Sequence, residues 1–189
     1  MARRTPRKPT AAYLERVALW YLERWFTTRS HLRRRLVERI DRGLAVHGGD
    51  RETLLQELDS LLDRLETQRH LDDRAYVRGR VRTLSLRGDS ERAIRAKLRA
   101  KGAPHDIVTE ALAECEEASD RLAACRYVRR RRLGSFRSRD PREDDARKDL
   151  ARLARAGFSY DIARDVLGME REAIEDLVFA SNQAAPSRD

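Results

Sequence analysis

The sequence predicts an all-α protein, built as an elongated, right- or left-curving stack of three tandem three-helix repeats of the helix-turn-helix type. Apolar residues recur at helical spacing, and capping residues, glycines and prolines separate one helical segment from the next. Charged residues make up 39% of the chain, against roughly 25% in globular proteins generally. A chain of this composition cannot fill one deep core, so we expect a thin stack with much solvated surface.

The pattern divides the chain into five parts. Residues 1–9 form a basic, proline-containing arm that we expect to be disordered. Three repeats are expected at 10–68, 69–116 and 117–181, and the polar tail at 182–189 is expected to be flexible. Within the third repeat, helical segments are predicted at 117–132, 143–156, 159–167 and 170–180, with a serine- and arginine-rich loop at 134–141.

The first predicted helix starts at Thr10, whose hydroxyl can cap it, and runs to about Phe26. Trp20 lies off its apolar stripe, so this residue either covers a neighbouring helix or contacts a partner. The inner face expected for this helix consists of Leu14, Val17, Ala18, Tyr21, Leu22 and Trp25.

Two further helices complete the first predicted repeat. One starts at Thr28 or Ser30 and is followed by a loop from Gly43 to Gly49. The other spans 51–67 and carries the clearest leucine stripe of the chain. About two and a half heptads are too few for a coiled-coil zipper, so we interpret the stripe as core. It consists of Leu54, Leu55, Leu58, Leu61, Leu62 and Leu65.

The middle stretch, His70 to Leu112, predicts three short helices, each with its own start signal. The Asp72-Asp73 pair offers carboxylates to the free N–H groups of a first turn. Asp89 or Ser90 can cap the second helix, and Pro104 opens the third, where its missing N–H costs nothing. Each helix has a narrow apolar face, so the three are expected to be stable only as a unit.

This middle stretch resembles the central repeat of the RecX family. The resemblance is carried by Leu-Asp-Asp at 71–73, an aromatic residue at Tyr76, and the later pattern Ile-x3-Leu-x3-Gly followed by Ile-x4-Leu. Arg29-Ser30 with Leu32 and Leu36 resembles the family's opening motif, and 157–162 its closing one. The motif residues are Leu71, Asp72, Asp73, Tyr76, Ile94, Leu98, Gly102, Ile107, Leu112, Gly157, Phe158, Tyr160 and Ile162.

The sequence departs from the family pattern at a few loop and cap positions. His31 stands where the family tends to have Glu, and His70 replaces the usual aromatic residue before Leu-Asp-Asp. The loop at Gly88 has one glycine where two are common. These departures affect local geometry and not the expected core.

A shift of 55 residues aligns the middle repeat with the C-terminal one. Five identities fall at core, stop and start positions, where a structural repeat should show. The aligned pairs are Leu98 with Leu153, Gly102 with Gly157, Asp106 with Asp161, Ile107 with Ile162, and Leu112 with Leu167. The alternative is a chance alignment of two amphipathic helix pairs.

The net charge of +9 indicates a polyanion or an acidic protein surface as partner. The alternative is solvated helix faces paired with Asp and Glu, and a GC-rich genome would by itself favour arginine over lysine. The run Arg129 to Arg132 has no acidic neighbour within four residues, which makes it the better binding candidate. The candidate contacts are Arg78, Arg80, Arg82, Arg92, Arg95, Lys97, Arg99 and Lys101 in one patch, and Arg126 with Arg129, Arg130, Arg131 and Arg132, near Arg137 and Arg139, in the other.

No residue pattern points to catalysis, a metal or a cofactor, so we expect a protein that is not an enzyme. Asp72 and Asp73 could form an acid or metal pair, but capping explains them more simply. Cys115 and Cys125 lack metal-site spacing and are expected to be small, buried residues in a reducing compartment. With no apolar run that would span a membrane and no signal peptide, a cytoplasmic location is expected.

The resemblance implies a regulator that lodges along the filament of RecA recombinase on DNA. It further implies limits on filament growth, ATP hydrolysis, strand exchange and co-protease activity. One alternative is a general basic helical protein that binds single- or double-stranded DNA through phosphates, weakly and without sequence preference. Another is a scaffold for an unrelated acidic partner. A monomer without a membrane partner is the expected state.

Overall fold

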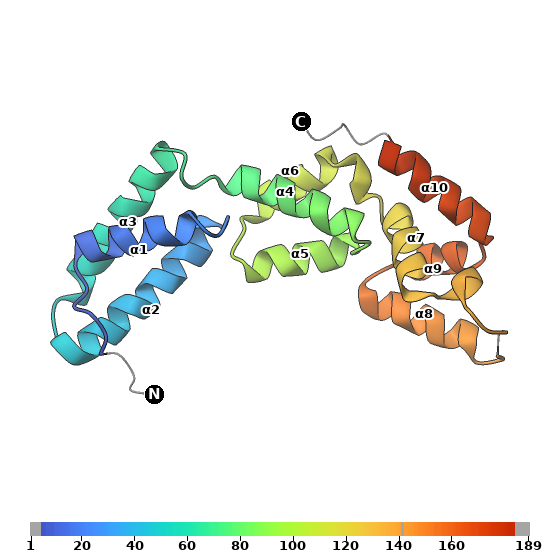
Figure 1. Ribbon diagram of the computed structural model, residues 1–189, viewed down its shortest axis with the longest axis horizontal. Helices are drawn as coiled ribbons and strands as arrows, with labels where there is room; N and C mark the ends of the chain where they lie inside the picture. The colour runs from blue at the N-terminus through green and yellow to red at the C-terminus, as the bar shows by residue number, and fades with distance from the viewer. Residues whose placement is uncertain (1–4, 141, 184–189) are drawn as a thin grey trace. The chain divides into compact units, whose positions relative to one another are not determined.

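The computed structural model describes residues 5–140 and 142–183, and this part of the chain contains α-helices and two short 3-10 turns but no strand (Figure 1). The all-α prediction is therefore confirmed. The predictions for residues 1–4, 141 and 184–189 fall outside the described residues. The helices are α1 Ala11–Leu22, α2 Arg29–His47, α3 Arg51–Thr67, α4 Asp73–Leu86, α5 Glu91–Ala100, α6 His105–Glu114, α7 Asp120–Arg131, α8 Asp145–Ala156, α9 Tyr160–Leu167 and α10 Arg171–Gln183.

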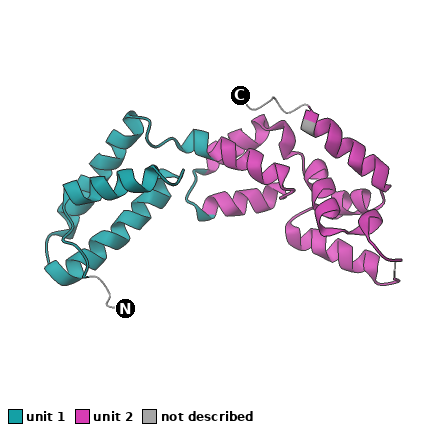
Figure 2. Ribbon diagram, in the orientation of Figure 1, with its two compact units in different colours: residues 1–76, 100–104 teal, residues 77–99, 105–189 magenta. Residues whose placement is uncertain are grey.

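The chain forms two compact units (Figure 2). One comprises the chain up to Tyr76 together with residues 100–104, and the other comprises residues 77–99 and the chain from His105 onward. The division into three repeats is not tested by this grouping and remains a prediction. The range expected for the third repeat, 117–181, contains α7, α8 and α9, the 3-10 turn at Gly134–Phe136, and all but the ends of the 3-10 turn at Glu116–Ala118 and of α10.

The core of the first unit is built by α1, α2 and α3 (Figure 1). Thr10 caps α1 by accepting a hydrogen bond from the backbone N–H of Tyr13, as expected. The leucine stripe of α3 forms this core and not a free coiled-coil surface. Its buried members are Leu58, Leu61, Leu62 and Leu65, which pack with Leu14, Ala18, Leu32, Leu36 and Ile40.

The first helix is shorter than predicted, and this places two aromatic side chains outside the core. Because α1 ends at Leu22, the chain leaves the helical register before Trp25. Trp25 is 47% exposed, so its assignment to the inner face was wrong. Trp20 is 45% exposed, and the suggestion that it covers a neighbouring helix is therefore not supported.

The segment before α1 also differs from expectation, since residues 5–9 lie against α2 instead of being disordered. Pro9 is buried, and the backbone carbonyl of Pro6 lies 2.8 Å from Nε2 of His47. The reason is Gly43, because a Cβ at this position would lie 2.7 Å from Cδ of Pro9. The helix continues through Gly43 to His47, so the loop predicted from that residue was wrong.

The apolar core at the C-terminal end of the second unit is formed by α7 to α10. Leu153, Val166 and Ile174 are fully buried in it, and Phe158 packs edge-on against Tyr127 with ring centroids 5.7 Å apart. Gly157 ends α8 with φ of 99°, as the repeat alignment predicts for a helix stop. The aligned Gly102 has φ of 71° after α5.

A polar junction not predicted from the sequence occurs once in each unit. In the first unit, the Thr28 hydroxyl caps α2 and donates to the carbonyl of Lys101 at 2.5 Å, while the backbone N–H of Arg29 donates to Asp73 at 2.7 Å. In the second unit, Ser90 accepts from the backbone N–H of Ala93 at 3.2 Å and donates to the carbonyl of Ala156 at 2.7 Å.

The second junction is completed in the same way as the first. The backbone N–H of Glu91 donates to Asp120 at 2.7 Å, as that of Arg29 does to Asp73. Burial raises the pKa of both aspartates. A glycine follows each accepting carbonyl, and a Cβ on Gly157 would lie 2.5 Å from Oγ of Ser90. Each junction therefore joins a helix N-terminus to a carbonyl that directly precedes a glycine, and that glycine position requires a residue without a side chain.

Replacement of Gly157 tests the junction. We expect Gly157→Ala to lower the free energy of unfolding by about 1–3 kcal/mol, because alanine is strained at this φ and meets Ser90. Gly79 in α4 has no heavy atom near the position of an added Cβ, so Gly79→Ala should raise stability by about 0.5–1 kcal/mol. Urea unfolding followed by circular dichroism measures both. Shifts of the same sign in the two variants would contradict this account.

Candidate functional site

The C-terminal end of α7 presents four consecutive exposed arginines, Arg129 to Arg132. The preceding turns bury Ala123, Ala124, Cys125 and Val128 in the unit's core, which fixes the helix and directs its end to solvent. Within the described ranges, none of the four arginines pairs with a carboxylate. Cations at a helix C-terminus are stabilised by its partial negative charge, so the cluster persists without acidic partners.

Two features organise this arginine cluster. The guanidinium groups of Arg130 and Arg131 lie over the Tyr127 ring, 5.7 and 5.8 Å from its centroid. Arg132 closes the helix in the left-handed conformation, with φ of 54°, and the backbone N–H of Leu133 donates to the carbonyl of Val128 at 3.0 Å. Glycine is the usual residue at such a position, so an arginine there is retained at a cost in stability.

Arg126 does not belong to this surface, and its assignment as a phosphate contact was wrong. The residue is only 5% exposed. Its guanidinium donates to the carbonyl of Ser85 at 3.1 Å and to the hydroxyl of Ser181 at 3.0 Å, so it ties α4 and α10 to α7. Burial lowers the pKa of Arg126. A buried guanidinium with internal acceptors is not available to a phosphate.

The candidates of the other predicted patch fall into two groups. Arg78 pairs with Glu114, Arg82 with Glu117, Arg95 with Glu91 and Lys97 with Asp89, at 2.6 to 3.2 Å. These pairs match the alternative of solvated, charge-compensated faces. Ion pairs are absent, among the residues that the structure covers, for Arg80, Arg92, Arg99 and Lys101. Of the eight candidates in this patch, these four are therefore the ones whose charge is available to a partner. Lys101 belongs to the first unit and the other three to the second.

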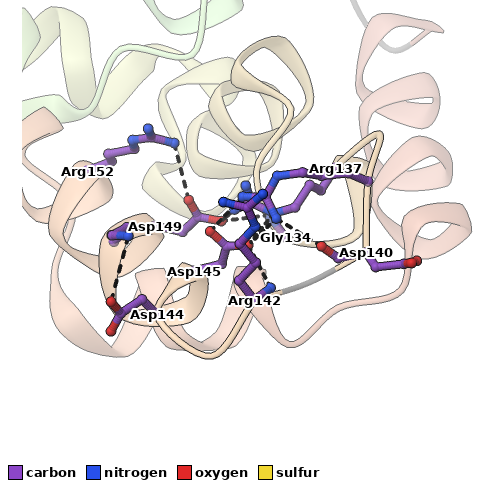
Figure 3. A network of polar contacts seen from close by, with 10 residues as sticks. Gly134, Arg137, Asp140, Arg142, Asp144, Asp145, Asp149 and Arg152 are labelled. Carbon is purple, nitrogen blue, oxygen red and sulfur yellow. Dashed lines mark hydrogen bonds and ion pairs between the residues drawn. The ribbon is translucent and has the colours of Figure 1, made fainter.

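The loop after α7 is held by carboxylates at the start of α8 (Figure 3). Asp149 is buried and accepts from the backbone N–H of Gly134 at 3.1 Å and from Arg137 at 2.5 Å. Asp145 accepts from Arg139 at 2.9 Å and from the backbone N–H of Arg142 at 2.9 Å. Arg137 and Arg139 are thus engaged within the unit and do not extend the arginine cluster.

Two further expectations from the sequence concern metal-ligand groups and cysteine thiols. They include no group of three or more His, Cys, Asp or Glu side chains placed to hold a metal ion. Burial raises the pKa of both Cys115 and Cys125, which disfavours the reactive thiolate. Every helix in the described ranges is too short or too polar to cross a lipid bilayer.

Comparison with known proteins supports the resemblance to the RecX family that the sequence motifs indicated. The family model described as "RecX, second three-helix domain" matches residues 72–112, which contain α4, α5 and most of α6. The "Regulatory protein RecX" of Myxococcus xanthus is 42% identical over 164 residues, covering 86% of this chain and 88% of that protein. The protein of the same name from Mycobacterium leprae is 35% identical, with coverage of 79% and 83%. The chain belongs to the RecX family.

A solved structure supports the fold assignment. The crystal structure of RecX from Lactobacillus salivarius matches with a TM-score of 0.59, covering 87% of this chain and 96% of that chain, at 20% identity. At this identity the likeness shows the fold alone. The RecX family is one of regulatory proteins, and this chain shares its helical architecture.

The RecX motif residues occupy structural positions, with one exception. Asp72 accepts from the backbone N–H of Ala75 at 2.9 Å, as a helix cap should, and Tyr76 is buried. Leu71, Ile94, Leu98, Leu112 and Phe158 are also buried, while Ile107 and Ile162 are partly so. The exception is Tyr160, which is 64% exposed at the start of α9, a helix that buries Ala163 and Val166; its structural role remains a prediction.

The left-handed arginine at the end of α7 predicts opposite effects on stability and binding. We expect Arg132→Gly to raise the free energy of unfolding by about 1 kcal/mol, because glycine removes the left-handed penalty, and to weaken binding to a polyanion. Arg69, at φ of 59° in the first unit, provides the control. Arg69→Gly should give a similar gain without loss of binding. Thermal unfolding and anisotropy with a labelled oligonucleotide measure the two effects; equal binding losses would contradict the assignment.

The Asp145 ion pairs predict a specific acid sensitivity. The hydrogen bonds from Arg139 and from the backbone of Arg142 hold the pKa of Asp145 well below its ordinary value of 3.8. Its contribution to stability is therefore present above pH 3.8 and is lost as the pH falls toward the lower folded-state pKa. Asp145→Asn should destabilise the protein at pH 7. In urea titrations at different pH values, the variant should also lose less of its free energy of unfolding below pH 3.8 than the original protein does. Asp144→Asn, which changes an exposed neighbouring residue, should leave this loss of stability at acid pH unchanged.

Proposed function

We propose that this RecX-family protein binds RecA–DNA nucleoprotein filaments and limits their growth, and with it ATP hydrolysis, strand exchange and co-protease activity. The observation that carries the proposal is the set of exposed, unpaired arginines at the end of α7 in a member of a regulatory family. A nucleoprotein filament offers phosphates and acidic side chains together, and arginine forks bind both. The protein would act by occupying filament surface and not by chemistry of its own.

The binding expected at this site is electrostatic and independent of base sequence. Each phosphate contact releases counterions, so the logarithm of affinity falls with the logarithm of salt concentration by about 0.7 to 0.9 per contact. Phosphate contacts position a protein on nucleic acid without reading its sequence. A regulator that must act anywhere along a filament needs this kind of contact.

A second candidate function, supported by the same arginines, is general DNA binding through phosphates. The two functions differ in what the protein prefers. A filament regulator should favour RecA-coated DNA over bare DNA, whereas a general binder should bind bare DNA tightly at moderate salt.

ATP hydrolysis by RecA of the same organism on single-stranded DNA tests the proposal. We expect loss of turnover when this protein is present well below one molecule per RecA, since blocking growth at a filament end affects many protomers. Inhibition that begins only when there is enough protein to coat the DNA would instead mean competition for phosphates. The general binding function would then be the correct one.

A matched pair of variants links this effect to the end of α7. Arg129→Gln with Arg132→Gln removes two open cations, whereas Arg147→Gln with Lys148→Gln removes two that already pair with the exposed Asp144. Both variants lose the same charge. The first should weaken inhibition and reduce the salt slope by about 1.4 to 1.8. Equal losses would mean that net charge alone, and not this site, determines binding.

A further inference from the structure

Both tryptophans of the protein lie on the surface of the first unit, beside each other. Trp20 and Trp25 are each nearly half exposed, and their rings meet edge to face with centroids 5.4 Å apart. Tyr21 lies 4.9 Å from Trp25, and the Arg24 guanidinium stacks over Trp20 at 4.5 Å. Large aromatic side chains gathered on a surface in this way indicate a binding site, because water solvates them poorly.

The aromatic surface continues into a groove lined by α1, α2 and the segment before α1. This groove has a volume of about 630 Å³, and an adjoining hollow of about 190 Å³ reaches Trp25. The two share Val17, Trp20 and Arg39 in their walls, so they lie next to each other. Pro9 packed against Gly43 holds the segment at residues 5–7 in place as one wall.

The charge of this groove is of one sign. Among the described residues that line it or the adjoining hollow, none is acidic. Arg7, Arg16, Arg39 and Arg42 line the groove and form no ion pair within the described ranges. Arg39 instead donates to the hydroxyl of Tyr13 at 3.4 Å, and Arg16 lies over the Tyr13 ring. Four uncompensated cations around a floor of aromatic rings favour a polyanion that also has flat apolar faces.

We propose that this groove binds a short segment of single-stranded DNA, with bases stacked on Trp20 and Trp25 and phosphates along the arginines. Aromatic platforms within a positive groove are how proteins bind single strands without sequence preference. A duplex hides its base faces, and the side chains that make a peptide acidic have no rings to stack. The choice of DNA over RNA rests on the proposed function. The groove belongs to the first unit, whereas the α7 arginines on which that function depends belong to the second.

The tryptophans provide a direct test, because all tryptophan fluorescence of the protein comes from this site. We would titrate the full-length protein, without RecA, with an oligothymidylate. We expect saturable quenching that weakens as salt is raised. An abasic strand of equal phosphate number, the corresponding duplex, oligouridylate and an oligoglutamate peptide are the comparison ligands, and each should bind less tightly than the oligothymidylate.

Substitutions then distinguish base stacking on the tryptophans from electrostatic attraction to the arginines. Trp20→Ala and Trp25→Ala should each weaken binding of a labelled oligothymidylate, measured by anisotropy, by about 5- to 150-fold, the range for loss of one stacked base. Trp20→Phe should retain most of the affinity. The control is Phe179→Ala, which removes an aromatic ring that is 65% exposed in the second unit and should change nothing. Circular dichroism of each variant verifies folding.

Several results would overturn the proposal. One is binding of the oligothymidylate without tryptophan quenching. Another is an affinity for the abasic strand or the duplex equal to that for the oligothymidylate, or a higher affinity for oligouridylate or oligoglutamate. The last is an unchanged affinity for the oligothymidylate in both tryptophan variants. The outcome is separate from that of the RecA experiment. If RecA inhibition below one molecule per protomer persists while quenching fails, the filament function stands and this site does not.

Discussion

The polar junction built around a helix-capping hydroxyl is the constraint on which much of this architecture depends. Thr28 and Ser90 are fully buried, and each caps one helix while donating to a carbonyl that directly precedes a glycine. Short helices with narrow apolar faces gain little from packing alone, so directional hydrogen bonds in a dry environment specify how they meet. The glycine beside each junction and the aspartate that accepts a further backbone N–H belong to the same arrangement.

The many basic side chains of this protein occupy three different environments. Some form exposed ion pairs, which contribute little stability but cancel charge. Others, such as Arg126 and Arg137, are enclosed and hold elements together. The remainder, including Arg129 to Arg132, have no acidic partner in the described ranges. Only this last group is available to bind an external anion. The total number of arginines and lysines therefore overestimates the basic surface that a partner can contact.

The two proposed surfaces use different physics in different units. The end of α7 offers guanidinium groups alone, suited to phosphates or carboxylates on any partner. The groove along α1 and α2 adds aromatic rings, so it distinguishes a strand with accessible base faces from other polyanions. A regulator of a filament on DNA gains from both, since one contact tolerates many partners and the other selects the single-stranded form.

The sequence by itself determined the helices, because caps, glycine stops and apolar periodicity act within a few residues. The family motif, the capping role of Asp72 and the core role of the α3 leucines followed from the same local signals. Tertiary structure alone decided which cations remain open, since the burial of Arg126 and the pairing of Arg137 depend on residues distant in the chain. It also decided the exposure of Trp25, because where α1 ends is set by packing as well as by propensity.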